Sequence, residues 1–152
     1  MKLKRTLVAL LALLLICPVM HSQKSVDQIF RDFSKEKGVV RVGLGKITFA
    51  FASLFTDVLG VNEIEVLSFE ECNQSVKERL NSAIASLKDK NYETMLSVNE
   101  EKERTKILVK TDGESIRELV VMTSGDNPAL IRIKGKIKPS DIDNVINKSK
   151  DK

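Results

Sequence analysis

The feature that most constrains the fold of this chain is a run of four consecutive strand-like segments in its second half. The segments lie at residues 92–98, 105–110, 115–122 and 130–137. The links between them are short and carry turn-forming residues, such as Asp112-Gly113 and the stretch from Ser124 to Pro128. Successive strands with short links pair with their neighbours, so the sequence predicts an antiparallel meander.

A short amphipathic helix is predicted near the start of the chain. Ser25 and Gln28 have the spacing of a capping box, in which each side chain accepts a hydrogen bond from the other residue's backbone N–H. The apolar positions that follow share one helical face, and they are Val26, Ile29, Phe30 and Phe33. We expect Gly38 to stop this helix and a short strand to follow at 39–44.

A strand and a second amphipathic helix are predicted between that region and the meander. The strand at 61–67 alternates apolar and acidic side chains. Ser68 and Glu71 then form a second candidate capping box, and Asn91 is a suitable end for the helix. The apolar stripe of this helix consists of Cys72, Val76, Leu80, Ile84 and Leu87. We expect the stripe to face the core.

Residues 46–59 are the most apolar stretch beyond the first 22 residues. Their apolar side chains surround a helical cylinder, and a helix of that kind is usually buried on most sides. A central core helix is the first interpretation. A helix that binds a partner or lines an apolar pocket is the second, with Phe49, Phe51 and Phe55 as the lining, and a pair of strands is the third.

These patterns predict an α+β fold in which helices pack on one face of an antiparallel sheet. We expect four to five strands, with the meander at the C-terminal end and the strand order left open. Pro139 and Ser140 begin a predicted final helix. Residues 23–147 have the size of a single domain, and residues 148–152 form a charged tail.

The N-terminus has the plan of a secretory signal peptide. Three cations precede an apolar run at 7–16, which is shorter than the ~20 residues that span a bilayer. We expect residues 1–22 to be removed after Ser22. A lipoprotein anchored through Cys17 and a retained membrane anchor are the alternatives. The predicted location is therefore the periplasm or the exterior, as a soluble protein.

Removal of the signal peptide, called the leader below, would leave the chain without the residues that most familiar active sites need. The single histidine, His21, and one of the two cysteines lie within it, which leaves Cys72 alone. A structural zinc site then lacks its ligands, and nucleophilic catalysis lacks its usual base. Of 25 basic residues three lie in the leader, so 22 face 21 acidic ones and nucleic-acid binding is not indicated. We expect no enzyme and no cofactor.

The last two strands resemble those of a known family. The residues that carry the resemblance are chiefly the stretch from Ile116 to Val121 and the stretch from Leu130 to Ile137. On these patterns the chain, from about Val26 to Ile146, is similar to the family called domain of unknown function 4252. The resemblance implies a compact envelope protein of Gram-negative bacteria, and it implies no reaction.

The last predicted strand alternates isoleucines with basic residues. The basic side would present Arg132, Lys134 and Lys136, with Arg104 and Lys106 from a neighbouring strand. We interpret it either as a solvated sheet face or as a patch for an acidic envelope protein or anionic lipid.

Two functions therefore remain as hypotheses. The first is a non-enzymatic interaction module of the cell envelope, whose oligomeric state the sequence leaves open. The second is a carrier of an apolar small molecule or lipid, with the pocket at Phe49, Phe51 and Phe55.

Overall fold

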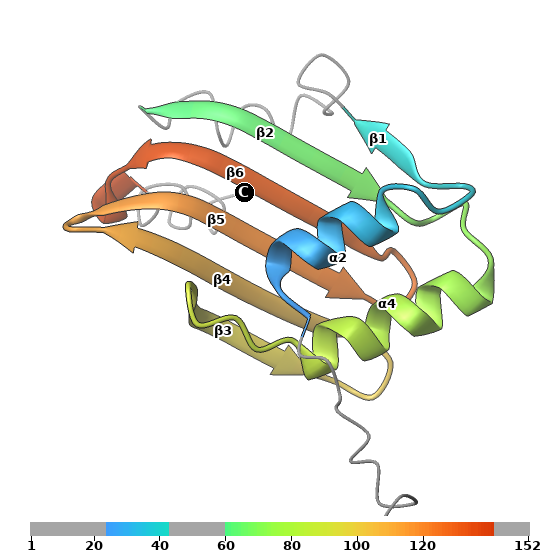
Figure 1. The fold of residues 1–152 in the computed structure, drawn as a ribbon. Helices are drawn as coiled ribbons and strands as arrows, with labels where there is room; N and C mark the ends of the chain where they lie inside the picture. The colour runs from blue at the N-terminus through green and yellow to red at the C-terminus, as the bar shows by residue number, and fades with distance from the viewer. Residues whose placement is uncertain (1–23, 43–59, 142–152) are drawn as a thin grey trace, which may run out of the picture.

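The predicted meander is present and forms the larger part of a six-stranded sheet (Figure 1). The computed structural model describes residues 24–42 and 60–141. The meander strands are β3 (Glu93–Asn99), β4 (Arg104–Asp112), β5 (Ser115–Ser124) and β6 (Ala129–Ile137). Strands β1 (Val40–Val42) and β2 (Val61–Ser68) complete the sheet. Every pair is antiparallel and the order is β1-β2-β6-β5-β4-β3. The expected fold class is confirmed, with one strand more than the upper expectation.

The β2–β6 pair joins two distant parts of the sequence. Its register runs from Ser68 opposite Ala129 to Val61 opposite Gly135. The backbones approach closely at the end of this pair, where the N–H of Lys136 donates to the carbonyl of Gly60 over 2.7 Å. Gly60 has a φ of 103°, and a Cβ there would collide with the Lys136 backbone. Only glycine fits this backbone conformation and this spacing.

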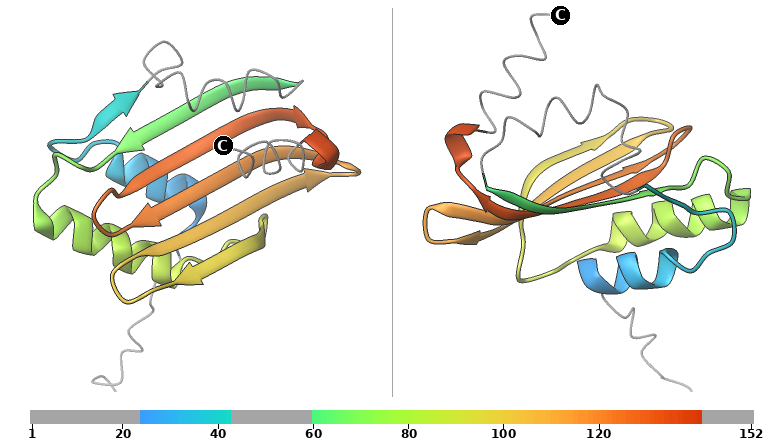
Figure 2. Two further views of the ribbon diagram at one scale, coloured as in Figure 1. Left: turned by 180° about the vertical axis from the view of Figure 1, so that it is seen from behind. Right: turned by 90° about the horizontal axis from the view of Figure 1, so that it is seen from above.

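The helices α2 (Val26–Phe33) and α4 (Gln74–Ser86) lie on the same face of the sheet, as the right view of Figure 2 shows. Both predicted apolar stripes are buried, from Val26 to Phe33 on α2 and from Cys72 to Leu87 along α4 and its flanks. They pack on Leu67, Val120, Met122 and Leu130 of the sheet. The capping box of α2 also forms, with both hydrogen bonds between Ser25 and Gln28.

Helix α4 begins later than its predicted capping box. Ser68 still belongs to β2, where it pairs with Val40 and Ala129. The N-cap is Asn73, whose side chain accepts from the N–H of Val76 over 3.0 Å. The predicted start at Ser68 is wrong because the strand continues through it, and asparagine caps a helix as well as serine does.

The face of the sheet opposite α2 and α4 is apolar. A second cluster of buried side chains consists of Val109, Ile116, Ile133 and Ile137. Ile131 and Leu119 pack against this cluster. The isoleucine side of β6 therefore faces away from α2 and α4, and on the basic side Arg132 lies beneath α2. Alternation along β6 was predicted correctly, but the side expected to be exposed to solvent is partly covered by α2, which buries Arg132.

Several expectations lie outside the residues that the structure describes. They are the signal peptide at 1–22, the apolar segment at 46–59 and the tail at 148–152. Residues 139–141 are helical, as predicted for the start of the final helix. Within residues 24–42 and 60–141, no helix is long and apolar enough to cross a membrane.

Candidate functional site

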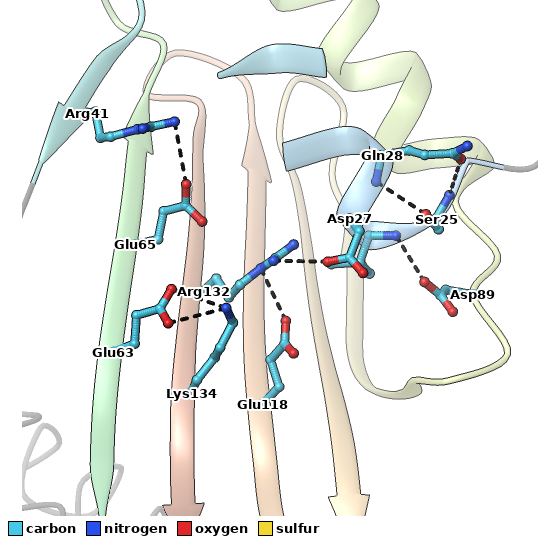
Figure 3. Close-up of polar contacts among 11 residues, drawn as sticks. Ser25, Asp27, Gln28, Arg41, Glu63, Glu65, Asp89, Glu118, Arg132 and Lys134 are labelled. Atoms are coloured by element: carbon cyan, nitrogen blue, oxygen red, sulfur yellow. Dashed lines mark hydrogen bonds and ion pairs between the residues drawn. The ribbon is translucent and has the colours of Figure 1, made fainter. Parts of the chain in front are cut away.

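The side chain of Arg132 is held between helix α2 and the sheet (Figure 3). It is only 8% exposed. Its Nη1 atom lies 3.0 Å from Oδ1 of Asp27, and its Nε atom lies 3.1 Å from Oε1 of Glu118 on β5. The guanidinium also stacks 4.1 Å from the ring centre of Phe30. Arg132 therefore fixes α2 to the sheet and is not available to a partner in solution.

Tyr92 lies beside this ion cluster. Burial raises the pKa of its hydroxyl well above the usual value, and hydrogen bonding to Glu118 and the charge of Glu118 raise it further. The Nε of Arg132 and the Oε1 of Glu118 approach closely without the alignment of a hydrogen bond, and Nη2 of Arg132 is also buried without one. The cluster is held by charge attraction and packing more than by a complete hydrogen-bond network.

Lys106 caps the C-terminal end of helix α4. Its ammonium donates to the carbonyls of Ile84 and Leu87, both over 3.3 Å. The last carbonyls of a helix lack partners within the helix, and a cation there is favourable. Burial lowers the pKa of Lys106, and the nearby charge of Arg104 lowers it further.

The other basic residues of the predicted face lie in three different environments. Lys134 pairs with Glu63 on β2, with 3.1 Å between Nζ and Oε1. Arg104 is half-buried, and Lys136 alone is exposed. The expectation that these residues form one wet basic face with Arg132 and Lys106 is wrong. Helix α2 covers part of that side, and neighbouring strands supply acidic partners.

In the described part of the chain, the other candidate groups form neither an activated nucleophile nor a metal site. Cys72 is buried, and burial raises the pKa of its thiol, so it is a poor nucleophile. No three potential metal ligands come together among residues 24–42 and 60–141. A groove between α2 and α4 is lined by charged side chains, among which Arg79 pairs with Glu36 at 2.9 Å. Phe49, Phe51 and Phe55 lie outside the described residues.

Three of the four large apolar side chains that are exposed in the described residues lie on the edge strand β3, and the fourth, Val40, lies on β1 at the other edge. All seven residues of β3 are exposed. Met95, Leu96 and Val98 are 53%, 44% and 36% exposed. Sequence reasoning identified this strand but not its place at the edge. No local signal revealed the edge, because β3 lacks the lysine and proline that mark many natural edge strands.

The fold and this edge define a small α+β protein with an open antiparallel sheet. The chain belongs to the family described as Domain of unknown function (DUF4252), whose model matches residues 33–145. The match confirms the resemblance seen in the sequence. The search of curated proteins and the search of solved structures gave no significant match.

Proposed function

We propose that this protein is a non-enzymatic interaction module of the cell envelope, and that its contact surface is the outer edge of β3. The leader at residues 1–22 supports export, because it has the charge and apolar pattern of a signal peptide. The partner would add a strand to the sheet, so that backbone hydrogen bonds supply affinity and side-chain contacts supply selectivity.

The observation that carries the proposal is the exposed, unshielded edge of β3. An edge strand presents a row of backbone N–H and C=O groups that no neighbouring strand uses. Strand β3 combines that row with three large exposed apolar side chains and only one charged residue, Glu93. Exposed apolar patches of this kind mark interaction sites.

The opposite edge of the sheet is a weaker candidate. Strand β1 has three residues, and its central residue is Arg41, which is exposed and pairs with Glu65 at 3.7 Å. Shortness and charge are two of the means by which natural proteins shield edges. The two edges therefore differ in the features that decide strand addition.

Photo-crosslinking in cells tests the proposal. A photoreactive amino acid replaces Ser97 on β3 in the full chain, and a matched variant carries it at Ser82, an exposed position on α4. We expect a discrete crosslinked product from position 97 and none from position 82. Absence of a product from position 97, with normal protein level, contradicts the proposal.

The carrier hypothesis stays a prediction of the sequence. Its pocket residues lie outside the described part of the chain, so no contact, distance or cavity bears on it. Strand addition is the function for which the described residues offer a surface.

A further inference from the structure

We propose that the outer face of the sheet, the face opposite α2 and α4, is the docking surface of residues 46–59 of this same chain. The segment would pack as a helix over β2, β6 and β5. This inference concerns a different surface from the edge of β3 and does not depend on strand addition there. Residues 46–59 lie outside the described residues, but the chain is described on both sides of them.

The middle of the outer face is buried although α2 and α4 both lie on the other side of the sheet (Figure 2). Ile133 and Ile137 of β6 are 0% and 2% exposed, and Val109 of β4 and Ile116 of β5 are each 5% exposed. Side chains of one sheet shield each other's flanks but leave their tips open. Burial of this degree therefore requires a second layer above the outer face.

The buried cluster is the centre of a wider apolar surface. Half-buried side chains that pack against it include Ile64 of β2, Leu119 of β5 and Ile131 of β6. Ile64 and Leu119 lie on either side of Ile133, with which both are in register. The outer face is thus a continuous apolar band across three strands, and an apolar layer would complement it.

The composition of residues 46–59 suits this surface. Lys46 and Asp57 are the only charged residues among them, and both stand near the ends of the segment. Phe51 and Phe55 are four residues apart, so in a helix they share one face. That face would supply two large apolar side chains to the band.

The places where the described chain stops and resumes fit a helix of this length. Val42 at the end of β1 is in register with Val66, and Gly60 lies six residues before Val66, which is roughly 20 Å along β2. A helix over residues 46–59 would be about 21 Å long. The same residues in an extended conformation would reach roughly 46 Å, far more than the span requires.

The charges on β2 indicate which face the segment covers. On the side of α2 and α4, Glu63 pairs with Lys134 and Glu65 pairs with Arg41. An apolar segment laid over these ion pairs would remove them from water without offering hydrogen bonds in return, which is costly. The outer face carries no such cost along β2, where Ile64 and Val66 lie.

Photo-crosslinking within the purified full chain tests the proposal. A photoreactive amino acid replaces Leu119 on the outer face, and a matched variant carries it at Lys110, an exposed position on the helix side of β4 beside Tyr92. We expect mass spectrometry of the digested protein to show position 119 joined to residues 46–59, and position 110 joined to none of them. A crosslink from position 119 to residues 142–152, to a second copy or to a lipid would overturn the proposal, and so would the absence of any crosslink.

Thiol labelling provides a second test on the same surface. In a chain whose own cysteines are replaced (Cys17→Ala and Cys72→Ala), Ile133→Cys places a single thiol on the outer face. Val120→Cys is the matched control, because it places the thiol on the inner face, beneath the helices. Both original residues are 0% exposed, so both thiols should be protected in the folded chain.

Removing the proposed contacts should then expose the outer face alone. With Phe51→Ser and Phe55→Ser added, we expect the thiol at position 133 to be modified about tenfold faster or more, whereas the thiol at position 120 stays protected. Unchanged protection at position 133 would overturn the proposal. If both thiols were modified, the whole sheet would have opened, and the crosslink from position 119 in the chain that keeps both phenylalanines decides.

Discussion

At the scale of single residues, Tyr92 gives the protein a built-in optical probe of its ion cluster. It is the only tyrosine, and the chain has no tryptophan. Burial and Glu118 raise its pKa in the folded state above the usual 10.0. Ultraviolet absorbance of the phenolate should therefore rise less on going above pH 10 in the folded protein than in denaturant, where it should rise with a midpoint near 10.

The same shift predicts how stability depends on pH. Because the folded pKa lies above the unfolded one, the contribution of Tyr92 is fully present below pH 10 and is lost as the pH rises beyond it. Urea unfolding of Tyr92→Phe should show a weaker decline above pH 10. A decline identical to that of the original chain would contradict the assignment.

Removing the charge of Arg132 alone should lower the stability of the fold far more than removing it together with that of Glu118. Arg132→Met leaves the carboxylate of Glu118 buried beside an apolar side chain, and we expect a loss of about 3 kcal/mol in the free energy of unfolding. The double variant with Glu118→Leu should recover most of that loss. Urea denaturation followed by circular dichroism measures both, and a single variant as stable as the original would rule out this role.

Lys134 and Lys136 should respond differently to charge reversal. Lys134→Glu would set a carboxylate beside Glu63, its present ion-pair partner, and we expect a loss of up to about 1 kcal/mol because the pair is partly exposed. Lys136→Glu changes an exposed side chain with no ion pair in the described residues and should leave stability unchanged within about 0.5 kcal/mol. Equal thermal midpoints for the two variants would contradict the expected difference.

At the scale of elements, the start of helix α2 depends on one hydroxyl. Ser25 accepts from the N–H of Gln28 over 3.2 Å. Ser25→Ala should cost about 1 kcal/mol of stability, because that N–H would lose its partner. Ser82→Ala on the exposed side of α4 is the control and should cost nothing, since alanine favours a helix interior. Thermal denaturation compares them, and equal losses would show that the cap contributes nothing specific.

The elements could be predicted because each carries its own periodic pattern. The stripes of both helices and all strands of the meander follow from apolar spacing and turn residues. The same spacing could not predict which face of β6 the helices cover. Ile133 and Arg132 are both buried, so apolar character alone does not reveal which side the helices cover. That depends on Asp27 and Phe30 of a distant helix.

Local patterns also could not predict which strand lies at the edge of the sheet. Strand β3 resembles the other meander strands, and its place at the edge follows from β2 joining the sheet beside β6. Strand order is a property of long-range pairing, which spacing within one segment does not encode. The candidate contact surface became visible only once that order was known.

At the scale of the whole molecule, the sheet depends on its last strand. Strand β6 lies between β2 and β5 and pairs with both. A chain that ends at Pro128 should therefore fail to form a cooperative fold, because the β1–β2 pair loses its connection to the meander. A chain that lacks only residues 148–152 should fold normally. Circular dichroism and thermal denaturation distinguish the two, and a cooperative transition in the shorter chain would contradict this dependence.

The central place of β6 also bears on when the protein can fold. Synthesis proceeds from the N-terminus, so the strand that unites the sheet is among the last to be made. Until residues 129–137 have emerged, β2 has no partner on that side and α2 lacks the arginine that holds it. Under the export proposed above, such a chain would stay unfolded during passage, as threading through a membrane channel requires, and would complete its fold only on the far side.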